Sequence, residues 1–182
     1  MEVDTSNIKD IHAMLVDVND KVVAELKELG IEPPSDLVAE PSLPSRMGAI
    51  SNDELGSLSD DFTRYFNFIT DELVFATARA KAHTAALVAV RARVTLDNKD
   101  KPVNIRSEHV ETDANVLICV ANKMRMDAYR DALEARLAKT SKSMDRINKE
   151  LTSRRDAHFA GIRKETHQNV QGRERSFAFG KR

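Results

Sequence analysis

The chain has 182 residues and a formal net charge of −1, with 41% hydrophobic, 31% charged and 5% aromatic residues, five prolines, six glycines and no tryptophan. This composition suits one ordinary domain with appendages and favours long helices over a thick layered core, so it predicts an all-α fold. We expect no membrane span, no signal peptide and no internal disulfide, because we find no apolar run of about 18 residues, no basic and apolar leader, and one cysteine, Cys119, in a hydrophobic setting. These exclusions favour a cytoplasmic protein.

Charge is distributed unevenly along the chain. Residues 1–61 carry a net charge of −10, residues 62–138 carry +2, and residues 139–182 carry +7. Such a split predicts a basic region for a polyanion, and an acidic region that screens it or binds a basic partner. Solvated faces and tails would explain the same charges without any binding.

The first predicted element is an acidic amphipathic helix within residues 1–29. Its apolar residues recur at spacings of three and four: Ile8, Ile11, Leu15, Val18, Val22, Leu26 and Leu29. Gly30 ends this helix, and four prolines in residues 30–50 predict an extended linker. We therefore expect the first helix to be a separate arm.

A long helix is predicted over residues 52–96. Ser51 and Glu54 have the spacing of a capping box at its start. Two heptad lines follow: Leu55, Phe62, Ile69, Ala76, His83 and Val90, and then Phe66, Leu73, Ala80, Leu87 and Val94. In residues 88–96 apolar and other residues also alternate, as they would in a half-buried strand. The heptad pattern extends over about forty residues and the alternation over only nine, so we predict a helix. His83 is expected to be a polar core position rather than a ligand.

The stretch "DNKDKPVN" predicts a turn, followed by a helix from about residue 107. Its expected apolar stripe is Val110, Ala114, Leu117, Ala121, Met124 and Ala128, and then, in a new phase, Leu133, Leu137, Met144, Ile147 and Leu151. The phase change predicts a stutter or a short break near residue 140. The two helices should form a long antiparallel hairpin, the core domain of residues 51–155, whose long seam predicts a homo-oligomer. Residues 156–182 lack a period and predict a flexible basic tail.

Motifs for catalysis or metal binding are missing from the sequence. The five histidines form no pair at i, i+4, and "DNKDKPVNIRSE" has lysines where a calcium loop needs oxygen ligands. There is no glycine-rich phosphate loop, nucleophile elbow or Cys/His couple. We therefore expect no enzyme, no metal site and no cofactor.

Two groups of residues are candidates for nucleic-acid binding. Five cations gather at the tip of the predicted hairpin: Arg91, Arg93, Lys99, Lys101 and Arg106. They could bind phosphates, or they could simply complement a helix dipole, and the first two point about 200° apart on a helix. The tail sequence "GRERSFAFGKR" mixes Arg173 and Arg175 with Phe177 and Phe179. Cations that follow phosphates and rings that stack on bases are typical of single-stranded DNA binding.

The order of features over about residues 62–155 resembles UvsY-type phage recombination mediators. The similar parts are "YFNFITDELVFATARAKAHTAALVAVRARV", a polar turn, and "HVETDANVLICVANKMRMDAYRDALEARLAKTSKSMDRINKEL". The resemblance implies a ring-like oligomer in the host cytoplasm that binds single-stranded DNA and loads a phage recombinase onto strands coated with single-strand binding protein. Arg91 and Arg93 match the family's basic residues before the turn; Lys99 and Lys101 are included only because they are nearby.

The acidic arm, the proline linker and the basic tail depart from that family's compact size, which puts a transfer of its partner contacts in doubt. The alternative is a helical phage structural or scaffolding protein without nucleic-acid activity. In that case the long helices would serve only assembly, and the charge split would drive head-to-tail packing.

Overall fold

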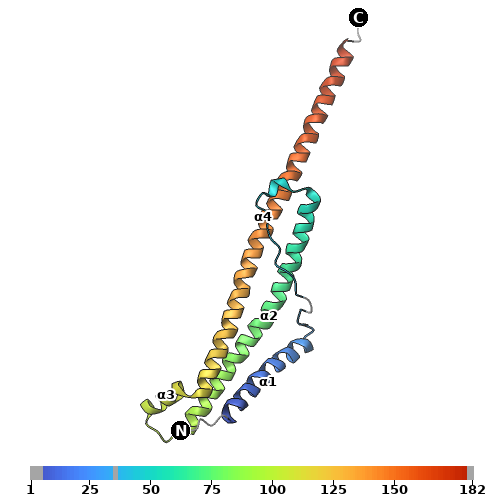
Figure 1. Ribbon diagram of the computed structural model, residues 1–182. Helices are drawn as coiled ribbons and strands as arrows, with labels where there is room; N and C mark the ends of the chain where they lie inside the picture. Colours follow the sequence, from blue (N-terminus) through green and yellow to red (C-terminus); the bar gives the residue numbers. More distant parts are fainter. Residues whose placement is uncertain (1–5, 35–36, 180–182) are drawn as a thin grey trace. The chain divides into compact units, whose positions relative to one another are not determined.

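The computed structural model describes residues 6–34 and 37–179, with side chains described for residues 10–34 and 37–162. Within these ranges the chain is mostly helical and forms no strand, which confirms the all-α prediction (Figure 1). The elements are α1 (Ser6–Glu28), the short 3-10 helix η1 (Met47–Ala49), α2 (Asn52–Asp97), α3 (Val103–Thr112) and α4 (Ala114–Phe179). Residues 88–96, where a strand was the alternative, belong to α2.

The chain divides into two compact units. Unit 1 comprises Met1–Ala39 and Phe66–Lys139, and unit 2 comprises Glu40–Tyr65 and Thr140–Arg182. The helices α2 and α4 each contribute a segment to both units. This division differs from the sequence-based one, which cut the chain at the ends of the expected hairpin.

Unit 1 is built from α1, α3 and the adjoining segments of α2 and α4. Its main core cluster contains Leu15 of α1 together with Ala86, Leu87, Val90, Val94, Val110, Val116 and Cys119. Because α1 contributes to this core, the prediction that the first helix is a separate arm is wrong. Tyr129 Oη donates to Glu72 Oε2 at 2.9 Å, while Leu87 packs in the cluster that holds Cys119, so α2 and α4 are antiparallel in this unit.

Gly30 ends α1 in the way the sequence predicts. Its φ is +77°, a left-handed conformation that glycine adopts without a Cβ penalty. The amide of Gly30 donates to the Lys27 carbonyl, and the amide of Ile31 donates to the Leu26 carbonyl, both at 2.9 Å. This pair of bonds is the Schellman motif, which satisfies carbonyls at the end of a helix.

His83 is a buried polar position between α1 and α2. Only 1% of it is exposed, and its Nε2 lies 3.2 Å from Asn19 Oδ1. The other ring nitrogen, Nδ1, is buried without a partner among the described residues. Burial, and secondarily the positive charge of Arg79, lower the pKa of His83 below its ordinary value of 6.5. The structure therefore places this histidine in the core, as the heptad line predicts.

Acidification should destabilise unit 1 through His83. Its folded pKa lies below its unfolded pKa, so the unfolded chain binds the proton first and stability is lost as the pH falls through 6.5 toward 5. One proton limits the slope to about 1.4 kcal/mol per pH unit. Urea unfolding at several pH values should show this loss in the native protein, and His83→Gln should flatten it. A native profile that is flat between pH 7 and 5 would contradict this assignment.

Unit 2 has a small core of its own. Leu55 and Phe62 of α2 and Ile147 of α4 are buried together, with partly buried apolar residues around them. The predicted capping box is present at the start of α2: the Ser51 amide donates to Glu54 Oε2 at 2.7 Å, and the Glu54 amide donates to Ser51 Oγ at 3.2 Å. Hydrogen bonds from the Ser51 backbone and side chain lower the pKa of Glu54.

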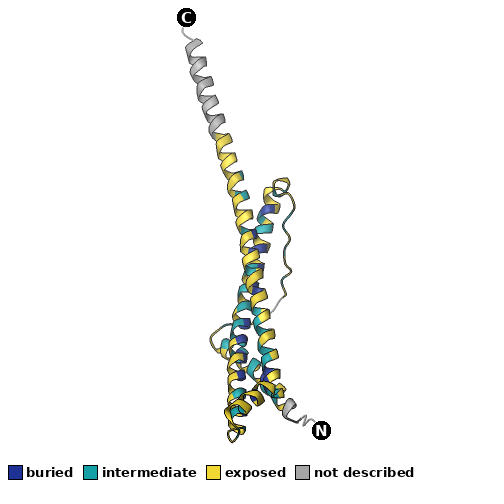
Figure 2. Ribbon diagram, turned by 90° about the vertical axis from the view of Figure 1, so that its left-hand side faces the viewer, coloured by how far each residue is buried: buried dark blue, intermediate teal, exposed yellow. Residues whose placement is uncertain are grey.

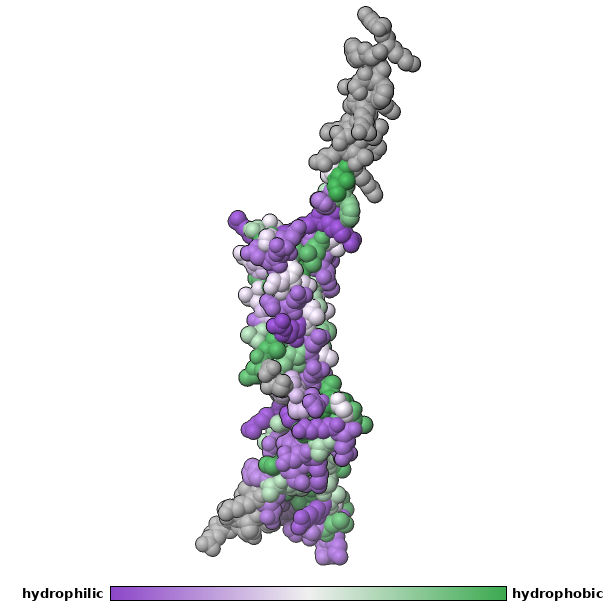
Figure 3. Space-filling model, turned by 90° about the vertical axis from the view of Figure 1, so that its right-hand side faces the viewer, coloured by the Kyte–Doolittle hydropathy of each residue, from purple (hydrophilic) through white to green (hydrophobic). Residues whose placement is uncertain are grey.

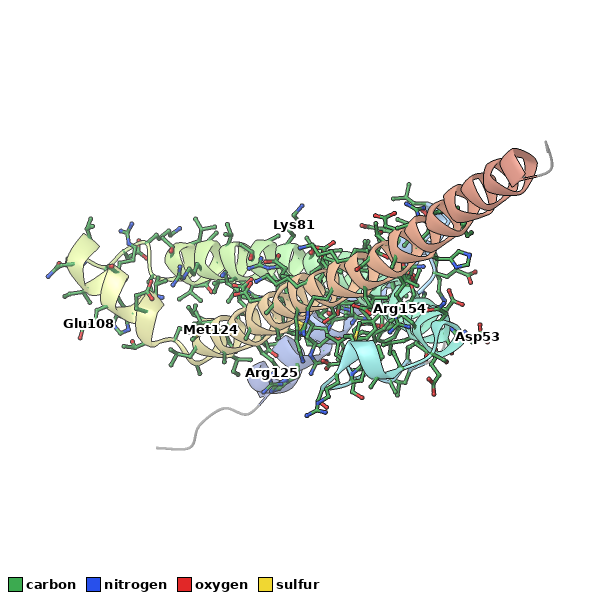
Figure 4. All side chains as sticks on the ribbon, turned by 90° about the horizontal axis from the view of Figure 1, so that it is seen from above. Asp53, Lys81, Glu108, Met124, Arg125 and Arg154 are labelled. Atoms are coloured by element: carbon green, nitrogen blue, oxygen red, sulfur yellow. The ribbon has the colours of Figure 1, made fainter. Side chains whose placement is uncertain are left out.

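Arg154 ties the chain before α2 to α4 in unit 2. Its Nη1 donates to the Ile50 carbonyl at 2.8 Å and to Asn52 Oδ1 at 2.9 Å, and its Nη2 donates to the Met47 carbonyl at 2.8 Å. Its Nε donates to Glu150 Oε1, also at 2.8 Å. Figure 4 shows Arg154 on α4 near the first turn of α2, which carries Asp53. One guanidinium group thus satisfies acceptors on two segments far apart in sequence.

The region predicted as one helix from about residue 107 contains two helices. Asp113, between α3 and α4, caps α4: its Oδ1 accepts from the amides of Asn115 at 2.8 Å and Val116 at 3.2 Å. Of the two alternatives predicted near residue 140, a stutter or a short break, the break is absent, because α4 continues through this position. The first part of the predicted stripe is wrong in phase within α4, since Leu117 is 52% and Met124 65% exposed while Val116 and Cys119 are buried. In the second part, Leu133 and Ile147 are buried, as the sequence predicts.

The backbone of residues 156–179 is helical rather than irregular. The sequence analysis predicted a flexible tail there because no apolar period continues, but α4 extends to Phe179. Residues 156–179 contain no proline, and eleven of these 24 residues are Arg, Lys, Glu, Gln or Ala, against two glycines. Extending an existing helix needs only propagation, so these helix formers suffice without a core to pack on. Residues 155–162 are exposed (Figure 2).

One helix, α2, meets a length and composition test for a membrane span. One 18-residue window of α2 reaches a mean hydropathy of 1.3, and 39% of that window is buried. Length and composition of this kind are weak evidence, because the core helix of a soluble protein satisfies them as well. On the face shown in Figure 3, apolar side chains form separate patches among hydrophilic ones.

Candidate functional site

The predicted cationic cluster lies around the turn between α2 and α3 in unit 1. The turn is closed by Asn98, whose Nδ2 donates to the Val94 carbonyl at 2.8 Å and whose carbonyl accepts from the Lys101 amide at 3.1 Å. The Lys99 amide also donates to the Leu96 carbonyl at 3.1 Å. Asn98 therefore ends α2, and Pro102 precedes α3 with the fixed φ of −53°.

Two of the five predicted cations bind other groups of the same chain. Arg106 Nη2 donates to the Lys101 carbonyl at 3.0 Å and also to the Lys99 carbonyl, so its guanidinium stabilises the turn. Arg91 Nη2 forms an ion pair with Glu111 Oε2 of α3 at 3.0 Å. These contacts reduce the positive charge that the turn could offer to a phosphate.

The other three cations do not form a compact binding surface. Arg93 and Lys99 are exposed, and Lys101 is half-buried. Arg93 lines a cavity beside α1, whereas Arg91 pairs with α3, in agreement with their predicted divergence around the helix. The structure thus brings Arg106 to the backbone of Lys99 and Lys101 without assembling the five charges into one site.

The four predicted tail residues, Arg173, Arg175, Phe177 and Phe179, belong to the backbone of α4. Their side chains lie outside the described residues. The predicted role of these two arginines and two phenylalanines therefore stays a prediction.

A row of cations that the sequence analysis missed lies on α4 in unit 2. Lys142, Arg146 and Lys149, which we call the basic stripe, are exposed and follow one another at spacings of four and three. This spacing places them on one face of the helix. Among the described residues they form no ion pair, unlike Lys123, which binds Asp127 Oδ2 at 2.5 Å. The same spacing rule, applied to charges instead of apolar residues, could have found them.

Cys119 offers no reactive thiol at the surface. It is 1% exposed in the core of unit 1. Burial, and then the negative charge of Asp113, raise the pKa of the thiol, which disfavours the nucleophilic thiolate. Its place as a small core hydrophobe agrees with the sequence prediction. No cluster of three or more His, Cys, Asp or Glu side chains suited to a metal ion occurs in the part of the chain that the structure describes.

Comparison with known proteins adds no relative: no protein-family model, no curated protein and no solved structure matches the chain.

Proposed function

We propose that this protein binds single-stranded DNA and acts as a recombination mediator that helps to load a recombinase. The observation that carries the proposal is the basic stripe, three exposed cations in line that make no ion pair among the described residues. Surface cations that have acid partners elsewhere in α4, such as Lys123 and Arg130, are already neutralised in part. A row without such partners is suited to replacing counterions along a phosphate backbone.

The sequence after the stripe supports the same proposal. Residues 139–182 carry a net charge of +7, and the tail adds Phe177 and Phe179 to its arginines. Aromatic rings favour single strands because they can stack on unpaired bases. The layout of residues 62–155 resembles the mediator family and supplies the expected partners, a phage recombinase and single-strand binding protein.

Self-association is part of the proposal. Leu117 and Met124 are exposed on the same face of α4 as the small residue Ala121, with spacings of four and three. Figure 4 labels Met124 on this helix. An exposed row of this kind is suited to a second helix, and a multimer would carry several basic stripes.

The stripe is tested by replacing Lys142, Arg146 and Lys149 with alanine together. We expect weaker binding to labelled single-stranded DNA and a salt dependence flatter by about 2 in log K against log salt, since each phosphate contact contributes about 0.7. Helicity should be kept, because alanine is the better helix former. The measurement is a fluorescence-anisotropy titration at several salt concentrations, with single-stranded and duplex DNA.

A matched control removes the same charge elsewhere: Lys27, Arg64 and Lys81, which are also exposed, replaced by alanine. Figure 4 shows Lys81 pointing away from α2. The control should keep the native salt slope. Equal losses in both variants would mean that only net charge matters, and no binding by the native protein at low salt would overturn the proposal.

The second candidate function is a helical structural or scaffolding protein. The same exposed line of Leu117 and Met124 favours it, because assembly alone would also use that face. The two functions differ in one measurement. A protein that forms multimers in sedimentation experiments, but does not bind DNA at low salt, would be an assembly protein.

A further inference from the structure

Unit 2 contains an open cavity of about 490 Å³ beside the start of α2. Asn52 of α2 lines it together with five residues of α4: Leu151, Thr152, Arg154, Arg155 and His158. Most of the lining surface is apolar, although most of these residues also carry a polar group. A cavity of this size, apolar with a few polar groups, is typical of a ligand site.

The two arginines of this cavity differ in what they can still bind. The guanidinium group of Arg154 already donates to Glu150, Asn52 and two carbonyls of the chain before α2. Arg155 is largely exposed, and the nearest atoms of its contact with Asp156 are 4.0 Å apart. The Arg155 guanidinium group is therefore open to an anion at its edge or to a flat ring on its face.

Two exposed rings follow Arg155 on α4. His158 lines the cavity, and the exposed ring of Phe159 lies next to it, with the two ring centroids 6.2 Å apart. The ring planes are inclined at 56°, so a flat group would stack on the free face of one ring rather than between the two. Figure 2 shows this part of α4 as exposed. Aromatic rings beside an arginine are the combination on which unpaired nucleic-acid bases stack.

The cavity adjoins the end of the basic stripe within unit 2. Lys149 and Thr152 line one shallow depression on α4, and Thr152 also lines the cavity. Lys149, Thr152, Arg155 and His158 are all exposed and follow one another at spacings of three, so they form one row along the helix surface. This row rises about 14 Å along the helix axis. A strand whose phosphates contact the stripe can therefore continue into the cavity.

We propose that this cavity and the rings beside it hold an unpaired base of the DNA strand whose phosphates the basic stripe binds. Phe159 or His158 stacks on the base, and Arg155 contacts the adjoining phosphate. Because a base in a duplex is already stacked on both faces, the site favours single strands. The inference rests on the proposed function, since it concerns the same strand, and it adds the part of the site that distinguishes single strands from duplex.

The first test compares two variants that differ only in the ring at position 159. Both contain His158→Ala; one adds Phe159→Leu, which keeps an apolar side chain without a ring, and the other adds Phe159→Trp, which keeps a ring. Both positions are exposed, so both variants should fold. The leucine variant should bind labelled oligothymidylate at least about fivefold less tightly than the tryptophan variant. Their salt slopes should be equal, because stacking releases no counterions from phosphates.

The same anisotropy titrations with duplex DNA provide the control, since loss of the ring should leave duplex binding unchanged. Equal affinities of the leucine and tryptophan variants for single strands, or equal losses for single strands and duplex, would overturn the stacking site. The proposed function would survive that result if the native protein still binds single strands with the salt slope expected of the stripe. If the native protein does not bind DNA at low salt, the proposed function fails, and the stacking site fails with it. A changed sedimentation of the leucine variant without changed DNA affinity would assign the rings to a second copy.

The second test locates the stacked base on the native, full-length protein. Oligothymidylate with one 5-iodouracil is bound and irradiated, which joins the uracil C5 to a stacked ring with loss of hydrogen iodide. Trypsin releases both rings in one peptide, residues 156–163, DAHFAGIR. Mass spectrometry should find the crosslinked nucleotide on this peptide. Crosslinks to Phe177 or Phe179 alone would overturn the site and assign the stacking to the end of the chain.

Discussion

Arg154→Ala is expected to lower the free energy of unfolding by about 2 to 4 kcal/mol. The substitution removes four hydrogen bonds from a charged donor; such bonds contribute roughly 1.5 to 3 kcal/mol each, and the contributions of bonds that share one guanidinium group do not add. It leaves the carbonyls of Met47 and Ile50 without their donor. Urea unfolding followed by circular dichroism measures the loss, and proteolysis should cut near residue 50 more readily in the variant.

The neighbouring arginine provides a control for this prediction. Arg155 is 68% exposed, and its contact with Asp156 is 4.0 Å long, at the limit of an ion pair. Its replacement by alanine should change stability by less than about 0.5 kcal/mol, as is usual for a surface residue. Similar effects of the two substitutions would show that Arg154 does not hold the chain before α2.

Ile147→Ala should cost about 2 to 5 kcal/mol, the range found for large-to-small changes in protein cores. Ile147 is fully buried between Leu55 and Phe62, so the lost methyl groups leave a cavity that these neighbours can only partly fill. The core of unit 2 is small, so each contact is a large share of the apolar packing in that unit. Thermal unfolding should show a clearly lower midpoint for the variant.

Phe159→Ala on the same helix is the matched comparison. Phenylalanine loses more side chain than isoleucine, but Phe159 is 54% exposed. Burial, not side-chain size, should decide the outcome, so this variant should unfold close to the native protein. A larger loss for Phe159→Ala than for Ile147→Ala would contradict the packing of unit 2.

The sequence was a good guide to α2 because its pattern is long and self-consistent. All six residues of the first heptad line, from Leu55 to Val90, are buried. The capping box and Gly30 were predictable for a related reason, since both depend on residues close together in the chain. Local chemistry and an extended period are the signals that a single sequence carries best.

The phase of α4 could not be predicted in the same way. The residues around position 120 contain two interleaved apolar sets, one with Val116 and Cys119 and one with Leu117 and Met124. Periodicity alone does not say which set faces α2. The Asp113 cap fixes where α4 begins, and packing in unit 1 then buries the first set.

The candidate site was only partly predictable, because the partners of a surface charge depend on tertiary contacts. Arg91 meets Glu111 twenty residues away, and Arg106 turns back to carbonyls of the preceding turn. Neither contact can be predicted from the residue types in the cluster. The basic stripe, by contrast, depends on one helix alone and was within reach of sequence analysis.

The single thiol of Cys119 can be used to measure local opening of the helices around it. A thiol reagent in water cannot reach a side chain that is 1% exposed until the surrounding helices separate. There is no second cysteine to confuse the signal. The rate of modification, compared with that of the unfolded chain, therefore measures the free energy of that separation, and it does so without denaturant and without any engineered label.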